Sequence, residues 1–142
     1  MRILYLEDSG DDTNKILDLL VSHGYQVDTA YSIYEARDFI SKNTYDCLII
    51  DINLSPDGLT IEQKKNIKGG VLTGWVWFQD EIMKKNNPLS EKAIIFSDYT
   101  EKLKSLVPPE TLINVGIIRK QGSTSRAEVL LEKIEELVRK NN

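Results

Sequence analysis

The chain has 142 residues, of which 41% are hydrophobic and 28% are charged, and its formal net charge is −4 at pH 7. This composition is typical of one folded domain with a core of ordinary size, and it excludes an intrinsically disordered chain. The acidic balance argues against sequence-independent binding to nucleic acid, which requires a basic face.

No targeting or membrane segment is recognisable. The stretch MRILYLEDSGDD turns acidic after a few apolar residues, unlike a signal peptide, and no apolar run is long enough to cross a bilayer. Cys47, the single cysteine, lies inside an apolar run and is predicted to be a buried thiol. We therefore expect a cytoplasmic protein that forms one domain over residues 1–142.

Short apolar runs alternate with amphipathic segments from the amino terminus onward. Residues 3–6 (ILYL) lack polar alternation, which predicts a strand that is buried on both faces. Residues 12–22 place their apolar side chains on one side, as a helix does. Residues 25–30 (YQVDTA) alternate between apolar and polar and predict a half-exposed edge strand.

The same alternation continues through the third predicted strand. Residues 32–42 carry apolar side chains at spacings of three and four, which predicts a helix. Ser32 is a candidate N-cap, and Glu35 stands three residues later, as in a capping box. Residues 47–50 (CLII) again form a continuous apolar run and predict a buried strand.

A long connection separates this strand from the next predicted helix. Residues 55–70 (SPDGLTIEQKKNIKGG) are read as an insert, since such loops usually have ~2–6 residues. We expect the insert to act as a lid or loop. A helical turn is expected at residues 60–67, where Thr60 and Gln63 can form a capping box. The following helix is predicted over residues 72–85.

The last third of the chain adds two more strands. Residues 93–96 (AIIF) and 115–118 (VGII) are apolar runs, and between them Pro108 limits the intervening helix to a short segment. Residues 125–140 form a clear amphipathic helix. Regular alternation of strand and helix predicts a five-stranded parallel sheet with helices on both faces, in which ligands bind at the carboxyl ends of the strands.

Polar side chains follow four of these strands. Glu7 and Asp8 follow the first, Asp51 the third and Ser97 the fourth, while Lys120 comes shortly after the fifth. Clustered carboxylates repel one another, and a hard divalent cation with oxygen ligands relieves that repulsion. A lysine and a hydroxyl can hold phosphate oxygens, and a carboxylate can itself become an aspartyl phosphate. The strand ends therefore predict magnesium and phosphoryl chemistry.

These strand ends resemble the receiver domain of two-component response regulators, the CheY-like superfamily. The resemblance covers nearly the whole chain and rests on four stretches: LED, IIDINL, IIFSD and IIRK. It implies a flavodoxin-like, doubly wound sheet with strand order 2-1-3-4-5. It also implies that Asp51 is the phosphoacceptor and that Ser97 and Lys120 bind the phosphoryl group. Magnesium would be held by four groups: Glu7 through water, Asp8, Asp51 and the backbone carbonyl of Asn53.

The resemblance further implies the partners of the chain. The phosphoryl group would come from a histidine kinase or a phosphotransfer protein. Since no effector module is recognisable, we expect a stand-alone receiver that signals through contacts with a downstream protein, as a monomer or weak dimer without nucleic acid or membrane. The chain would be a phosphoacceptor and not an enzyme. A hydrolase with Asp51 as nucleophile would need an acid two residues later, where the chain has Asn53.

Four features depart from the receiver pattern. One is the insert at residues 55–70. Asp98 replaces a residue that is usually small, Ile118 replaces a residue that is often aromatic, and Gln121 replaces the usual proline, where a cis bond would now cost ~2.5–4 kcal/mol. These departures support an alternative hypothesis, in which the chain is a receiver-like protein-binding module that works without phosphorylation.

Overall fold

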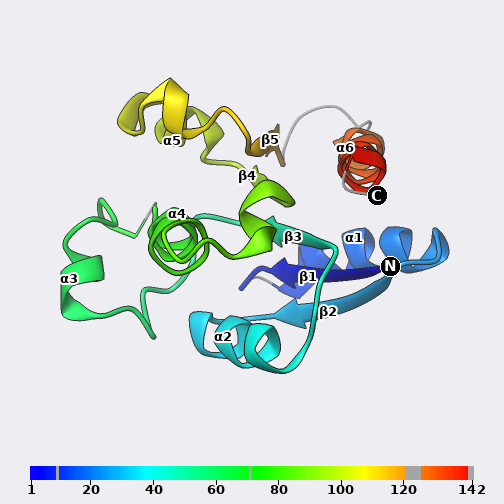
Figure 1. Cartoon of the computed structure of the whole chain (residues 1–142), viewed down its shortest axis with the longest axis horizontal. Coiled ribbons are helices and arrows are strands. Elements are labelled where there is room, and N and C mark those ends of the chain that lie inside the picture. Colours follow the sequence, from blue (N-terminus) through cyan, green and yellow to red (C-terminus); the bar gives the residue numbers. More distant parts are fainter. Residues whose placement is uncertain (9, 71, 121–125, 141–142) are drawn as a thin grey trace.

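Five parallel strands form one sheet at the centre of the protein (Figure 1). The computed structural model describes residues 1–8, 10–70, 72–120 and 126–140. The strands are β1 (Arg2–Leu6), β2 (Gln26–Ala30), β3 (Cys47–Ile50), β4 (Ala93–Ser97) and β5 (Gly116–Arg119). Their order in the sheet is β2-β1-β3-β4-β5, which confirms the predicted flavodoxin-like topology.

Helices cover both faces of the sheet. The α-helices are α1 (Gly10–Ser22), α2 (Ile33–Lys42), α3 (Ile61–Lys64), α4 (Thr73–Phe78), α5 (Thr100–Leu106) and α6 (Arg126–Lys140). Shorter segments are the π-helical turn η1 (Gln79–Met83) and the 3₁₀ turns η2 (Pro88–Glu91) and η3 (Pro109–Thr111). Figure 1 shows α1 and α6 on one side of the sheet and α2, α4 and α5 on the other. In the described residues, every helix is too short or too polar to span a bilayer.

The two helical layers explain why the strands lack polar alternation. Along β3, Leu48 and Ile50 pack into the apolar cluster on the side of α2 and α4, whereas Cys47 and Ile49 pack into the cluster on the side of α1 and α6. All four side chains are fully buried. Since each buried aliphatic side chain contributes ~1.5–3 kcal/mol, both faces favour apolar residues and no polar position remains in the strand.

Local sequence signals determine several element boundaries. The Ser32 hydroxyl caps α2 by accepting a hydrogen bond from the Glu35 N–H at 3.1 Å, which confirms the predicted N-cap. β2 is an edge strand with half-exposed side chains, as its alternation predicted. Leu106 ends α5 shortly before Pro108, as expected. β5 begins at Gly116 and not at residue 115, so the predicted strand was displaced by one residue.

The helix predicted over residues 72–85 takes a different form. Regular α-helix ends at Phe78, and the chain continues as the π-helical turn η1. Within η1, Ile82 is buried in the core and Glu81 forms a two-pronged ion pair with Arg37 of α2, at 2.6 and 2.8 Å. Hydrophobic periodicity predicts a helical segment, but it does not distinguish an α-helical from a π-helical turn.

The insert at residues 55–70 is anchored to the core. Leu59 and Ile67 retain only 7% and 8% of their exposure. Thr60 and Gln63 form the predicted capping box at the start of α3, with bonds of 3.1 and 2.8 Å between side chain and backbone. Figure 1 shows α3 beyond α4, away from the sheet. The insert is therefore a packed extension of the α4 side and not an unattached loop.

Candidate functional site

The parallel sheet brings the predicted strand-end residues to one edge. The backbone hydrogen bonds between strands continue one residue beyond the strand ends. The Asp51 N–H donates to the carbonyl of Leu6 at 2.9 Å, and the Lys120 N–H donates to the carbonyl of Ser97 at 3.0 Å. Glu7, Asp51, Ser97 and Lys120 consequently lie together at the carboxyl ends of β1, β3, β4 and β5. These four predicted residues form one site.

Asp51 is held by two hydrogen bonds to one of its oxygens. Its Oδ1 accepts from the Ser97 hydroxyl at 2.7 Å and from the Asn53 N–H at 3.1 Å. Ser97 is fully buried, and its Oγ in turn accepts from the Tyr99 N–H at 3.2 Å. The hydroxyl proton of Ser97 is therefore directed at Asp51, which fixes the orientation of the carboxylate.

Lys120 lies between two buried carboxylates. Its ammonium donates to Glu7 Oε2 and to Asp51 Oδ2, the latter at 3.3 Å. The side chains of Lys120, Glu7 and Asp51 retain only 10%, 1% and 12% of their exposure. Two carboxylates thus share one ammonium in a largely dehydrated site, and this group carries one uncompensated negative charge when all three are ionised.

This imbalance appears in the pKa values of the site. Burial, together with the nearby charge of Glu7, raises the pKa of Asp51 from 3.8 to about 6, although the Ser97 hydrogen bond and Lys120 act in the opposite direction. Burial lowers the pKa of Lys120, but its hydrogen bond to Glu7 and the charges of Asp51 and Glu7 outweigh burial, so that this pKa lies above its usual 10.5. Lys120 therefore stays charged while Asp51 is poised to bind a cation or a proton.

Asp8 does not join this group. It is exposed, and its Oδ2 accepts a hydrogen bond from the Ser55 N–H at 3.1 Å. The predicted ligands fit magnesium in their chemistry, since carboxylate and carbonyl oxygens are its preferred donors. Their arrangement fits less well, because no three acidic, histidine or cysteine side chains of the described residues are grouped to hold an ion. Asp8 faces Ser55, while Glu7 and Asp51 face Lys120.

Two of the residues that depart from the receiver pattern can be located, namely Asp98 and Ile118. Asp98 is exposed, next to the buried Ser97. Ile118 retains 6% of its exposure and packs with Phe96 in the core beside α6, so it forms part of the core. Gln121 lies outside the described residues. The effect of Asp98 on a bound phosphoryl group stays a prediction.

Gly74 is a site residue that sequence reasoning missed. Its N–H donates to the carbonyl of Ile52 at 2.9 Å, and an added Cβ would lie 2.5 Å from the carbonyl oxygen of Asp51. Helix α4 therefore packs directly against the backbone that carries Asp51. The glycines at 69, 70 and 74 are visible in the sequence, but only the fold shows which one marks a close approach.

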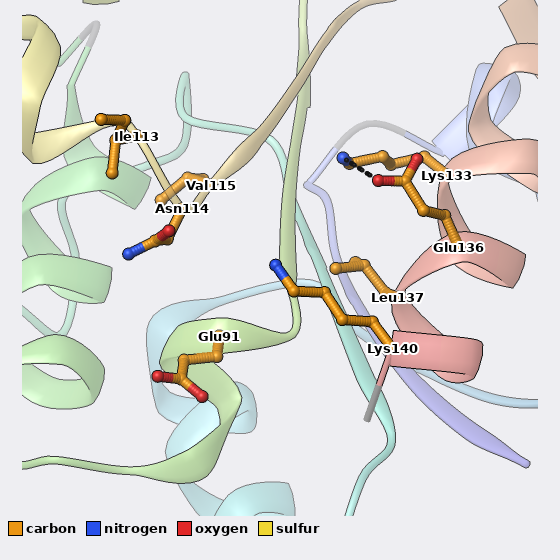
Figure 2. A pocket seen from close by; sticks show the side chains of 8 residues that line it. All are labelled: Glu91, Ile113, Asn114, Val115, Lys133, Glu136, Leu137 and Lys140. Atoms are coloured by element: carbon orange, nitrogen blue, oxygen red, sulfur yellow. Dashed lines mark hydrogen bonds and ion pairs between the residues drawn. The ribbon is translucent and has the colours of Figure 1, made fainter. Parts of the chain in front are cut away.

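A separate hollow of about 200 Å³ lies at the opposite edge of the sheet, near the amino ends of β4 and β5 (Figure 2). Figure 2 shows Lys140 extending from α6 into this hollow, while Lys133 pairs with Glu136 at 3.3 Å. Glu91 lines the other side. Two lysines and two glutamates balance one another here, so the hollow carries no charge imbalance of the kind found around Asp51.

Comparisons with known proteins agree with this fold. No protein-family model matches the chain, and no curated protein is similar to it in sequence. The chain is similar to the solved structure of response regulator TrrA from Thermotoga maritima in complex with Mg²⁺ and BeF, at 22% identity and a TM-score of 0.66 over 96% of this chain and 97% of that one. The chain is also similar to the structure of chemotaxis protein CheY4 from Vibrio cholerae, at 20% identity and a TM-score of 0.67 over 96% of this chain and 97% of that one.

A third similar structure is the receiver domain of the Francisella response regulator 1452, with 19% identity and a TM-score of 0.65 over 99% of this chain and 98% of that one. All three alignments span nearly the full length of both chains. The protein therefore has the fold of response-regulator receiver domains, which confirms the fold that the resemblance implied.

Proposed function

We propose that the protein is a receiver of two-component signalling, which accepts a phosphoryl group on Asp51 from a histidine kinase or a phosphotransfer protein. The observation that carries this proposal is the buried Asp51 carboxylate, oriented by Ser97 and paired with Lys120 at the carboxyl edge of the sheet. The retained 12% exposure of the Asp51 side chain supports access by a phosphodonor from that edge.

The transfer replaces a phosphorus–nitrogen bond with a phosphorus–oxygen bond. A carboxylate oxygen of Asp51 attacks the phosphorus of a phosphohistidine, and the bond to the imidazole nitrogen breaks with its electron pair. The imidazole of the donor takes up a proton from solvent. Lys120, which stays protonated, neutralises the charge that develops on the phosphoryl oxygens, and the Ser97 hydroxyl donates to one of them. The chain itself is the acceptor and turns over no substrate.

Magnesium completes the proposed site. We expect Asp8, Asp51 and the backbone carbonyl of Asn53 to hold it directly, with Glu7 contributing through water. When bound, the ion would neutralise phosphoryl oxygens and reduce the repulsion among the carboxylates. The uncompensated charge of the Glu7, Asp51 and Lys120 group supports binding of a cation at this edge.

We place the output of the proposed receiver on a downstream protein. Phosphorylation would redirect Ser97 and Lys120 from the carboxylate to the phosphoryl group and thereby shift an equilibrium of the helices around β5. Tyr99, Leu106 and Val129 are exposed apolar side chains at or on the helices that flank β5. They support a protein as the partner.

Intact mass after incubation with phosphoramidate tests the proposal. We expect the wild-type protein to gain the mass of one phosphoryl group with Mg²⁺, and little without it. Asp51→Asn should gain none. Asp57→Asn is the matched control, since Asp57 is an exposed carboxylate nearby in the chain, and it should behave as wild type. Equal gain by Asp51→Asn and wild type would refute the assignment of Asp51.

A second candidate function is favoured by one observation. Ile118 is fixed in the core, so the protein has no aromatic side chain at this position that could move when Ser97 moves. This observation supports the alternative of a receiver-like module that binds its partner without phosphorylation. The same mass measurement separates the two candidates, because the alternative predicts that wild type stays unmodified at saturating phosphoramidate and Mg²⁺.

A further inference from the structure

We propose that the backbone N–H of Ser55 holds the Asp8 carboxylate away from Glu7 and Asp51, so that magnesium binding is coupled to the conformation of the insert at residues 55–70. This inference rests on the proposed function, because it concerns the metal site of that function. It adds a regulatory contact that connects the insert with the proposed phosphoacceptor site. We call it the Asp8–Ser55 contact.

The first step of the argument is the position of Asp8. Glu7 and Asp8 are neighbours at the end of β1, but their carboxylates have different partners. Glu7 bonds Lys120, whereas Asp8 Oδ2 accepts from the Ser55 N–H at 3.1 Å. No metal-binding group of three side chains occurs in the described residues. Our inference is that Asp8 gives up this hydrogen bond when it joins Asp51 around one ion.

The second step is that Ser55 is a fixed donor. Leu54, directly before it, retains 4% of its exposure and belongs to the core. The Ser55 hydroxyl accepts from the Asp57 N–H at 3.3 Å, and the Leu59 N–H donates to the carbonyl of Pro56 at 3.1 Å. Gly58 continues the turn with φ +98°, and a Cβ there would lie 3.1 Å from Ile33 Cβ of α2. This segment is held in place on both sides of the donor.

The third step is that the middle of the insert is anchored as well. Gln63 Nε2 donates to Glu81 Oε2 at 3.1 Å, and Glu81 is paired with Arg37 of α2. These side chains are partly buried. Because the insert is anchored, Ser55 does not easily follow Asp8 if the carboxylate rotates toward Asp51, so we expect metal binding to weaken the Asp8–Ser55 contact.

The coupling is reciprocal. If the contact opposes metal binding, then metal binding must weaken the contact by the same factor. A single hydrogen bond is worth about 0.5–1.5 kcal/mol, so we expect a factor of about three to ten in the magnesium dissociation constant. A partner that grips the insert and strengthens the contact would thus lower magnesium occupancy, and one that pulls Ser55 away would raise it.

Amide hydrogen exchange of the wild-type protein by NMR tests the contact directly. With saturating Mg²⁺, the Ser55 amide should exchange about three to ten times faster than without it. The amides of Asp57 and Leu59 are internal controls, because they bond within the insert and do not touch Asp8. Their exchange should stay the same.

A pair of variants tests the same contact by calorimetry with Mg²⁺. Ser55→Pro removes the N–H and should tighten magnesium binding about three- to tenfold. Ser55→Ala keeps the N–H and should bind magnesium as wild type does. If Ser55→Pro does not fold, the hydrogen-exchange measurement on the wild-type protein still tests whether Mg²⁺ weakens the Asp8–Ser55 contact.

The outcomes separate this proposal from the proposed function. If Mg²⁺ binds and phosphoramidate modifies Asp51 while Ser55 exchange is unchanged, the contact does not oppose the metal and this inference is wrong, although the receiver function stands. If Mg²⁺ does not bind at all, the inference falls together with the metal requirement of that function. Faster exchange at Ser55 alone, with tighter binding by Ser55→Pro, supports the coupling.

Discussion

The sheet carries an ion-paired network at each end, and the two networks differ in their charge balance. At the amino end, the Arg2 guanidinium donates to Asp28 Oδ2 at 2.8 and 3.1 Å, and the Tyr45 hydroxyl donates to the same oxygen at 2.6 Å. Arg2 also lies 5.4 Å from the centre of the Tyr45 ring. Burial and the hydrogen bond to Asp28 raise the pKa of Tyr45, so its phenol remains a donor. One cation balances one carboxylate.

At the carboxyl end, one cation serves two carboxylates. Lys120 bonds both Glu7 and Asp51, and the pKa of Asp51 rises to about 6 because burial and the neighbouring carboxylate both disfavour its charge. A balanced network mainly ties strands together. An unbalanced, buried one favours the arrival of a cation or the chemical modification of a carboxylate. The difference supports the proposal that the network at the carboxyl end is the functional one.

The difference between the two networks is tested most strongly by replacing the cation of each network, Lys120 or Arg2, with a neutral residue. Lys120→Gln should lower the free energy of unfolding by about 3–5 kcal/mol at pH 8, because it removes the ammonium that both buried carboxylates contact. Arg2→Gln should lower the free energy of unfolding by less, about 1–2 kcal/mol. The Asp28 side chain is 21% exposed and keeps its hydrogen bond from the Tyr45 hydroxyl. Urea unfolding of the two variants measures both values. Equal costs would mean that the networks do not differ in the way described.

Two glycines, Gly74 and Gly116, differ in what an added side chain would contact. An added Cβ at Gly74 would meet the Asp51 carbonyl oxygen at 2.5 Å, whereas at Gly116 it would meet the flexible end of Lys133 at 2.9 Å. Gly74→Ala should therefore cost about 3 kcal/mol, and Gly116→Ala less than about 1 kcal/mol. Thermal unfolding of both variants checks the ranking. A Gly74→Ala protein as stable as wild type would show that the backbone of Asp51 yields easily.

The charge of Asp51 can be tested by its pH dependence. Because its pKa is raised from 3.8 to about 6, the folded protein keeps a proton that the unfolded chain releases, so this group lowers stability as pH rises from about 4 to 6. Asp51→Asn should be more stable than wild type by about 3 kcal/mol above pH 6, and the difference should vanish below pH 4.

Asp28→Asn provides the contrast, since it loses the ion pair with Arg2. It should be less stable than wild type at neutral pH. Denaturant unfolding between pH 4 and pH 8 gives both curves. If Asp51→Asn were destabilised in the same way as Asp28→Asn, Asp51 would be a structural carboxylate like its counterpart.

A further prediction concerns the Ser97 hydroxyl. Ser97→Ala should cost about 1 kcal/mol and move the pKa of Asp51 further above about 6, because the hydrogen bond that favours the charged form is lost. Ser105→Ala is the control, since the hydroxyl of Ser105 is exposed and bonds only within α5. Carboxyl ¹³C titration of Asp51 measures the shift, and an unchanged pKa would contradict the role given to Ser97.

Much of the fold follows from short-range patterns. The continuous apolar run of β3 predicted burial on both faces, and the structure divides its alternate side chains between two cores. The capping residues Ser32 and Thr60 were also predictable, because a cap depends on residues three positions apart. The convergence of Asp51 and Lys120 followed from parallel topology alone.

Other features depend on contacts between distant segments and were not predictable. The Asp8–Ser55 contact joins residues 47 positions apart. The close approach of Gly74 to Asp51 depends on how α4 lies on the sheet, and the change from α-helix to π-helix after Phe78 leaves the hydrophobic pattern unaltered. Burial of Leu59 and Ile67 in the core turned an expected loop into an anchored insert.

The most direct test of the central claim is to locate the phosphoryl group on the chain. Protein treated with phosphoramidate and Mg²⁺ is reduced with borohydride, which converts an aspartyl phosphate to homoserine, and its peptides are sequenced by mass spectrometry. We predict homoserine at position 51 and at no other aspartate. Homoserine at Asp8 or Asp57 with Asp51 unchanged, or no homoserine in a protein shown to be folded and magnesium-bound, would contradict the account.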